Sequence, residues 1–170
     1  MKTGVLWLTG LSGAGKTTLS NNVYQQLQQA GHHPILLDGD VMRTILPLYG
    51  FDENSRKEYN LIVGRLAAFL EQKGHLVIAA LISPYRSIRD TIRMQCSNFY
   101  EVHVAADIDT CIKRDCKGLY KKALAGELSN FTGISSPYET PLAPDLVLDT
   151  ASLSETECTE ILLHFLKSHR

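Results

Sequence analysis

The segment GLSGAGKTT, at residues 10–18, has the residue types and the spacing of a phosphate-binding loop. It matches the pattern G-x4-G-K-[ST], in which Lys16 and Thr17 follow the second fixed glycine. Glycines allow the backbone to curl so that several N–H groups point at phosphate oxygens. The Lys16 ammonium can then reach the β- and γ-phosphates, and the Thr17 hydroxyl is placed to bind Mg²⁺. We expect nucleotide binding by the residues Gly10, Leu11, Ser12, Gly13, Ala14, Gly15, Lys16, Thr17 and Thr18.

A second chemical feature is the segment LLDGD, which contains Asp38 and Asp40. Two carboxylates beside a bound triphosphate repel it unless Mg²⁺ stands between them or one of them takes a proton from an incoming hydroxyl. Both residues are therefore candidate catalytic groups together with Lys16. The following residues, DGDVMR, also favour a turn and a helix start, in which Asp40 could be both cap and base. The chain has no NKxD guanine-reading motif, so a small phosphotransferase is favoured over a switch GTPase.

Short apolar runs alternate with longer segments of helical periodicity along the chain. The apolar runs are almost continuously hydrophobic, which is typical of strands buried on both faces of a parallel sheet. Such sheets bind ligands at the carboxyl ends of their strands, here in the loops after Thr9, Leu37, Leu81 and Ala105. We expect an α/β fold with strands at 5–9, 34–38, 75–81, 100–105 and 145–149, and helices at 16–30, 53–73, 85–96, 107–114 and 152–168.

Two of these helices can be described in more detail. Ser152 and Glu155 have the spacing of a capping box, which would start the last helix. In the helix at 53–73, the apolar residues Val63, Leu66 and Leu70 recur at helical spacing, so we expect this stripe to face the core.

Length and charge limit the function further. A chain of 170 residues fits one domain, which we take as residues 1–170. The net charge of −1 gives no general electrostatic reason to expect a nucleic acid or membrane partner. No apolar run approaches the roughly 20 residues of a membrane span, and the first residues lead into the glycine-rich loop rather than a cleavage site. The four cysteines form no CxxC pair, so we expect free thiols in a cytoplasmic protein.

The segments LISPYRSIR (81–89) and RDCKGLYKKALAGELSNFTGISSPYETPLAPDLVLD (114–149) closely resemble adenylylsulfate kinases. Together with GLSGAGKTT and LDGD, the resemblance extends from about Gly4 to Asp149. It implies a three-layer P-loop kinase fold, with ATP and Mg²⁺ as cofactors, and transfer of the γ-phosphate of ATP to the ribose 3′-hydroxyl of adenylyl sulfate. It also implies a possible homodimer, because the family is commonly dimeric.

The resemblance further implies a mobile lid at approximately 114–136. Arg114 would approach ATP, while Lys121 and Lys122 are expected to be a solvated basic face. Cations that close over a phosphoryl group in flight stabilise its negative charge once water is excluded. Three lid residues would face the acceptor nucleotide: Lys117, Gly118 and Leu119.

The same resemblance suggests how the acceptor is held. Phe51 and Phe131 would stack on either side of its base, and the guanidinium groups of Arg43 and Arg56 would bind its phosphate–sulfate end. Ser83 occupies the position for which a phosphoserine intermediate has been proposed in the family. We favour direct in-line transfer, because no residue adjacent in sequence could activate this hydroxyl. The implied substrate-binding residues are Arg43, Phe51, Arg56, Tyr59, Ile82, Ser83, Lys117, Gly118, Leu119 and Phe131, and the implied catalytic residues are Lys16, Asp38, Asp40 and Ser83.

The chain departs from the family pattern in the acceptor half of the site. Val41 and Tyr59 stand where asparagines are expected, and Leu61 and Ile62 stand where paired arginines are expected. These changes bear on the acceptor, for which adenylyl sulfate is the main hypothesis and another nucleotidyl compound such as cytidine diphosphoramidate is the alternative. A nucleotide-binding regulator without catalysis is a further alternative, against which the retained loop, carboxylates and lid argue.

Overall fold

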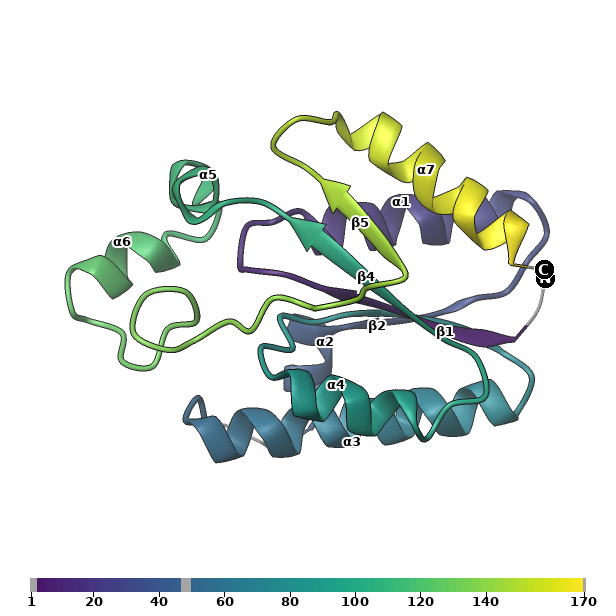
Figure 1. The fold of residues 1–170 in the computed structure, drawn as a ribbon, viewed down its shortest axis with the longest axis horizontal. Helices are drawn as coiled ribbons and strands as arrows, with labels where there is room; N and C mark the ends of the chain where they lie inside the picture. The colour runs from purple at the N-terminus through teal and green to yellow at the C-terminus, as the bar shows by residue number, and fades with distance from the viewer. Residues whose placement is uncertain (1–2, 47–49, 170) are drawn as a thin grey trace.

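The computed structural model describes residues 3–46 and 50–169. A sheet of five parallel strands runs through the middle of the molecule (Figure 1). The strand order is β2-β3-β1-β4-β5, so the first strand is central. This confirms the predicted α/β class and the predicted strands to within one residue at each end. The strands are β1 (Gly4–Thr9), β2 (Ile35–Asp38), β3 (Leu76–Ala80), β4 (Phe99–Ala105) and β5 (Leu146–Asp149).

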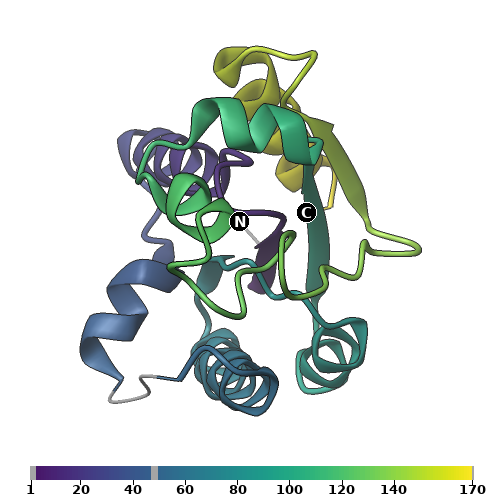
Figure 2. The same ribbon diagram turned by 90° about the vertical axis from the view of Figure 1, so that its left-hand side faces the viewer.

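Helices cover both faces of the sheet and complete the three layers of the predicted fold. On one face lie α1 (Lys16–Gln29) and α7 (Glu155–Ser168), and on the other lie α3 (Glu53–Gln72) and α4 (Arg86–Arg93) (Figure 1). The short helix α2 (Gly39–Ile45) follows β2 directly. Two further helices, α5 (Ile108–Arg114) and α6 (Leu119–Leu124), lie beyond the carboxyl ends of the strands, within and beside the predicted lid (Figure 1). Seen end-on, they lie in front of the sheet (Figure 2).

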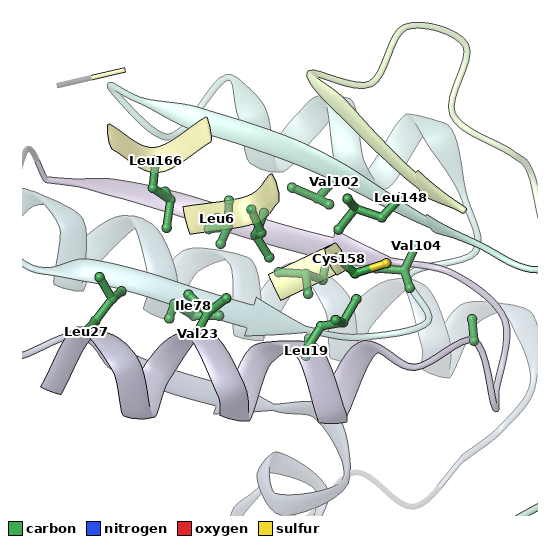
Figure 3. Close-up of a cluster of buried hydrophobic side chains, with 14 of the residues drawn as sticks. Leu6, Leu19, Val23, Leu27, Ile78, Val102, Val104, Leu148, Cys158 and Leu166 are labelled. Carbon is green, nitrogen blue, oxygen red and sulfur yellow. The ribbon is translucent and has the colours of Figure 1, made fainter. Parts of the chain in front are cut away.

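The core has two halves, one on each side of the sheet. Successive side chains of a strand point to opposite faces. In β1, Leu6 and Leu8 therefore join the cluster under α1 and α7, part of which Figure 3 draws, while Val5 and Trp7 join the cluster under α3 and α4. All four side chains have no exposed area, which explains why this strand reads as a continuous apolar run. The loop that follows β1 is consequently attached to the most buried strand of the molecule.

The predicted apolar stripe of α3 is confirmed as core. Val63 is completely buried, and Leu66 and Leu70 are partly buried against the same cluster. Gly64 on this helix lies so close to α4 that a Cβ would meet Ile92 at 2.4 Å. The two helices therefore pack tightly enough to hold α3 in a defined position relative to the sheet.

The capping-box prediction for the last helix is wrong by two residues. The box is formed by Ser154 and Glu157, and α7 starts at Glu155. The segment SLSETE contains the S-x-x-E spacing twice, so the spacing alone does not decide between the pairs. The Ser152 hydroxyl instead donates a 2.8 Å hydrogen bond to the Asp149 carboxylate, because the turn after β5 comes first. Helix α6 was not predicted, and for α2 the sequence indicated only a possible helix start at DGDVMR.

Membrane insertion through a helix finds no support in the described ranges. None of the helices within residues 3–46 and 50–169 combines the length and the hydrophobicity that a membrane span requires.

Candidate active site

The phosphate-binding loop connects β1 to α1 at the centre of the sheet. Gly10 passes so close to β4 that a Cβ would lie 2.4 Å from the Val104 carbonyl oxygen, which excludes a larger residue without a backbone shift. Gly15 precedes α1 with a φ of 101°, in the left-handed region that favours glycine. Because helix N-termini carry unpaired N–H groups, the start of α1 presents a favourable environment for an anion at this edge. The structure therefore explains why glycine is needed at both fixed positions of the motif.

Lys16 is the first residue of α1, and its side chain is buried. Its Nζ donates hydrogen bonds to the carbonyl oxygens of Gly10, at 2.9 Å, and Leu11, at 2.7 Å. Burial lowers the pKa of Lys16 to about 8, although nearby acidic groups, among them Asp40, act in the opposite direction. The ammonium is thus held inside the loop in a poorly solvated position, where a bound phosphate would restore the preference for the charged form.

Asp38 is the last residue of β2, and its carboxylate connects two parts of the site. Its Oδ2 accepts a 2.8 Å hydrogen bond from the Thr17 hydroxyl, and its Oδ1 accepts from the N–H groups of Asp40, at 2.9 Å, and Val41, at 3.3 Å. Asp38 is therefore the N-cap of α2, and the prediction that Asp40 could cap this helix is wrong. The reason is that the extended strand conformation continues through Asp38, while Asp40 already lies in the first helical turn.

Thr17 and Asp38 also have the donor atoms of a magnesium site. Mg²⁺ prefers oxygen ligands and usually takes one or two carboxylates from the protein, with phosphates and water as its remaining ligands. The Thr17 hydroxyl and the Asp38 carboxylate already lie within 2.8 Å of one another. Across residues 3–46 and 50–169 there is no cluster of three His, Cys, Asp or Glu that could hold a metal alone. The pair therefore fits a metal ion that arrives with a nucleotide.

Asp40 faces the lid rather than the loop. Its carboxylate forms an ion pair and hydrogen bond with the Lys117 ammonium, which comes from the segment between α5 and α6. Both side chains are more than half exposed, at 68% for Asp40 and 57% for Lys117. The sequence left open which of the two carboxylates is the base. The geometry distinguishes them, because Asp38 is engaged by the loop and by α2 whereas Asp40 is accessible.

The segment predicted to be a lid, at approximately 114–136 and called the lid here, contacts the phosphate loop at two points. Arg114 donates to the Gly13 carbonyl oxygen at 3.2 Å and to the Thr150 hydroxyl at 3.1 Å, so it lies against the phosphate loop, and its contact with ATP stays a prediction. The Tyr120 hydroxyl donates to the Ser12 carbonyl oxygen at 2.8 Å. Sequence reasoning missed both Thr150 and Tyr120. Thr150 could have been found, because it follows the carboxyl end of β5 and the rule that selected the other loops applies there as well.

A second group of predicted residues comes from α2, from α3 and from the segment just before α3. The guanidinium carbon of Arg43 lies 4.5 Å from the ring centre of Phe51 and 4.2 Å from that of Tyr59. The ring of Phe51 is exposed, whereas Tyr59 is buried and its hydroxyl donates a 2.5 Å hydrogen bond to the Gly39 carbonyl oxygen. The structure therefore brings Arg43, Phe51 and Tyr59 together next to the acidic turn.

Arg56 lies against the lid, and Phe131 is part of it. Arg56 is buried, and its guanidinium donates to the Thr132 hydroxyl at 2.7 Å and to the Asn130 carbonyl oxygen. The Phe131 ring packs edge-on against Tyr120, with 4.9 Å between the ring centres. In this structure the nearest aromatic contact of Phe131 is thus within the lid, and Phe51 contacts Arg43 instead. The predicted stacking of a base between Phe51 and Phe131 stays a prediction.

Known proteins that are similar to this chain identify its family. The family model described as adenylylsulphate kinase matches residues 2–149, which is most of the chain. The chain belongs to the adenylylsulphate kinase family. The match contains both carboxylates of the LDGD turn, the phosphate loop and the whole lid.

Several curated adenylyl-sulfate kinases are similar along nearly the full chain. The one from Bacillus velezensis is 47% identical over 98% of this chain and 86% of its own length. The one from Synechococcus sp. is 47% identical over 96% of this chain and 94% of its own length. Among solved structures, a Mycobacterium tuberculosis APS kinase in complex with AMPPNP and APS is 36% identical, with a TM-score of 0.93 and 98% coverage of both chains. These matches confirm the family and the fold expected from the sequence.

Within this adenylylsulphate kinase fold, Ser83 has an unusual environment. It is buried with a φ of 45°, and its hydroxyl has no hydrogen-bond partner within the described part of the chain. Its carbonyl oxygen accepts from Arg89 at 2.6 Å, and the Thr9 hydroxyl donates to the carbonyl oxygen of Ile82 at 2.7 Å. The loop after β3 is therefore fixed by its backbone, and the Ser83 hydroxyl is left for a further contact.

The structure also shows where the remaining residues named in the family resemblance lie. Gly118 precedes α6 with a φ of 65°, and Leu119 is the first residue of that helix. Val41 is exposed on α2, whereas Leu61 and Ile62 are half-buried on α3. The prediction that Lys121 and Lys122 are solvated is confirmed, because both are exposed on α6.

Proposed function

We infer that this chain is an ATP-dependent adenylyl-sulfate kinase, which phosphorylates the ribose 3′-hydroxyl of adenylyl sulfate to give 3′-phosphoadenylyl sulfate. The observation that carries the inference is the ion pair between Asp40 and Lys117, both of which lie near enough to act electrostatically on Lys16, in a chain that belongs to the adenylylsulphate kinase family. An accessible carboxylate and a lid cation are the groups that phosphoryl transfer to a hydroxyl requires. The similarity to adenylyl-sulfate kinases at 47% identity supports adenylyl sulfate as the acceptor.

The nucleotide half of the site would bind ATP on the phosphate loop, residues 10–18. Lys16 would neutralise the β- and γ-phosphates, and Arg114 would hold the nucleotide side of the lid against the loop. Thr17 and Asp38 would hold Mg²⁺, as their 2.8 Å contact permits. When bound, the metal neutralises charge on the phosphates and so assists departure of ADP.

In the acceptor half, Asp40 would orient the 3′-hydroxyl and accept its proton. The hydroxyl oxygen forms a bond to the γ-phosphorus while the bond from that phosphorus to the bridging oxygen of ADP breaks, in one in-line step. Lys117 would exchange its contact with Asp40 for the oxygens of the transferring phosphoryl group, where its charge stabilises the transition state. Ser83 needs no covalent role in this scheme, and its unpartnered hydroxyl would contact the acceptor.

The acceptor wall would use residues from α2, from α3 and the segment just before it, from the loop after β3 and from the lid. Arg43 would bind the phosphate–sulfate end, since a guanidinium suits such anions. Phe51, exposed next to it, would stack on the base. The proposed wall is completed by residues from the loop after β3, from α3 and from the lid: Ile82, Ser83, Arg56, Lys117, Gly118, Leu119 and Phe131.

Two further parts of the proposal concern assembly and location. A homodimer is proposed from the family likeness alone. A relative from Thiobacillus denitrificans is described as a hexameric APS kinase, and this chain covers 29% of that longer chain. A cytoplasmic location is proposed because all four cysteines are free thiols, the state favoured in a reducing compartment.

A coupled ADP-release assay tests the proposal. We expect saturable turnover when ATP, Mg²⁺ and adenylyl sulfate are present, and much weaker turnover with cytidine diphosphoramidate. Preference for cytidine diphosphoramidate would overturn the acceptor assignment while leaving the kinase chemistry intact. Binding of ATP without turnover of any nucleotidyl acceptor would instead support the regulator hypothesis.

A further inference from the structure

The peptide group that joins Gly39 to Asp40 is held from both sides. Its N–H donates a 2.9 Å hydrogen bond to the Asp38 carboxylate, and its carbonyl oxygen accepts a 2.5 Å hydrogen bond from the Tyr59 hydroxyl. Tyr59 lies on α3, 20 residues further along the chain. Because α3 is packed tightly on α4 and the sheet, this contact ties the acidic turn to a rigid part of the fold.

The ring of the same tyrosine supports Arg43. The guanidinium carbon of Arg43 lies 4.2 Å from the Tyr59 ring centre, within the range of a cation–π contact. Only 3% of Tyr59 is exposed, and it belongs to the core cluster that contains Met42 and Val63. A ring held in this way offers Arg43 a fixed platform, whereas Phe51 on the same guanidinium is exposed.

We propose that Tyr59 is a positioning residue that aligns Asp40 through its hydroxyl and Arg43 through its ring, without itself contacting the acceptor. The inference rests on the proposed function, which assigns Asp40 to the acceptor hydroxyl and Arg43 to the acceptor anion. It revises the sequence-based expectation that Tyr59 binds substrate directly, because a side chain with 3% exposure offers almost no surface to a ligand.

The chemistry of the tyrosine suits both tasks. Burial, with the nearby carboxylates of Asp40 and Asp38, raises the pKa of Tyr59 to about 12, while Arg43 acts in the opposite direction. The hydroxyl therefore remains protonated and able to donate throughout the neutral pH range. The asparagine expected by family resemblance has no ring, so it cannot provide the platform under Arg43.

Two substitutions separate the hydroxyl from the ring. Tyr59→Phe removes the hydrogen bond to Gly39 and keeps the ring, so kcat should fall roughly tenfold while the KM for adenylyl sulfate stays within about twofold. Tyr59→Leu removes both, so the same loss of kcat should be joined by a roughly tenfold higher KM for adenylyl sulfate. The KM for ATP should remain unchanged in both variants. Tyr100→Phe is the matched control, since this half-buried tyrosine packs against Phe165 at the far side of the sheet.

Steady-state kinetics of the purified full chain, with thermal unfolding to confirm folding, gives the outcomes. A fall in kcat without a change in KM for Tyr59→Phe, and a change in both for Tyr59→Leu, supports the inference. Wild-type kinetics in Tyr59→Phe would overturn it, and so would an equal rise in KM in both variants, because the hydroxyl would then contact the acceptor. If the wild-type chain does not turn over adenylyl sulfate, the proposed function fails and the inference fails with it. If the wild-type chain turns over adenylyl sulfate and both variants have wild-type kinetics, the inference is wrong while the proposed function stands.

Discussion

Lys117 of the lid and Asp40 of α2 form an ion pair, although their positions in the sequence differ by 77. Both side chains are largely exposed, and exposed pairs of this kind contribute roughly 0–1 kcal/mol to stability. A weak pair is readily exchanged for stronger partners. The contact therefore places the lid cation beside the proposed base, and a bound acceptor and phosphoryl group can replace it.

Removal of the lid cation should affect chemistry more than folding. We expect Lys117→Met to lower kcat on the order of a hundredfold, because one stabilising charge is lost from the transition state. Thermal unfolding should be nearly unchanged, given the exposure of the side chain. Steady-state kinetics with adenylyl sulfate measures the effect. Lys121→Met, on the exposed face of α6, is the control and should behave as the wild type.

The two carboxylates of the LDGD turn should respond differently to substitution. Asp40→Asn should lower kcat at least on the order of a hundredfold with little change in stability, because it removes the proposed base from an exposed position. Asp38→Ala, in contrast, should lower the free energy of unfolding by about 1–2 kcal/mol, since it removes the N-cap of α2. It should further raise the Mg²⁺ concentration needed for half-maximal rate. Equal loss of stability in both variants would contradict the different environments described for the two residues.

The pH profile should report the buried lysine of the phosphate loop. The pKa of Lys16 is about 8 in the free protein, so raising the pH through this value removes its positive charge. We therefore expect kcat/KM for ATP to be level below pH 8 and to fall by about tenfold per pH unit well above it. In the profile of kcat the fall should occur at higher pH, because bound phosphates raise the pKa of the ammonium.

A substitution at the same position provides the control for this profile. An arginine stays charged over the accessible pH range, so any activity that Lys16→Arg retains should show no fall near pH 8. The same fall in Lys16→Arg as in the wild type would assign it to another group.

Arg89 should be important for stability although it lies outside the proposed chemistry. It is 2% exposed, forms a 2.5 Å ion pair with Glu101, and donates to the carbonyl oxygens of Ser83 and Glu139. Among the described residues, Arg89→Ala leaves the Glu101 carboxylate with the partly exposed Arg93, at 3.5 Å, as its remaining cationic partner. The free energy of unfolding should therefore fall by about 3 kcal/mol or more. Urea unfolding measures this change. Arg65→Ala, on the exposed face of α3, should change it by less than about 0.5 kcal/mol.

Much of the fold could be predicted from local patterns. The buried strands read as continuous apolar runs because both of their faces are covered, and the glycines at positions 10 and 15 are required by contacts and backbone angles that the motif implies. Short elements were missed, because a helix such as α6 has too few residues to show periodicity. The duplicated S-x-x-E spacing before α7 could not be resolved without knowing where β5 ends.

The site was predictable where the chemistry depends on adjacent residues, and less so where it depends on distant ones. The sequence identified Asp38 and Asp40 as a pair, yet only the fold shows that one faces Thr17 and the other Lys117. The role of Tyr59 is similar. The family resemblance implied that it binds substrate, whereas its hydroxyl contact with the acidic turn depends on how α2 packs against α3.

The position of the transferred phosphate tests the central claim most directly. The wild-type chain would be incubated with ATP, Mg²⁺ and adenylyl sulfate, and the product examined by correlated proton and phosphorus NMR, with Lys16→Ala as the inactive control. We expect the new phosphorus signal to couple to the ribose 3′ proton, and no product to form in the control. A phosphate at any other position, or ATP consumption without a phosphorylated acceptor, would contradict the account.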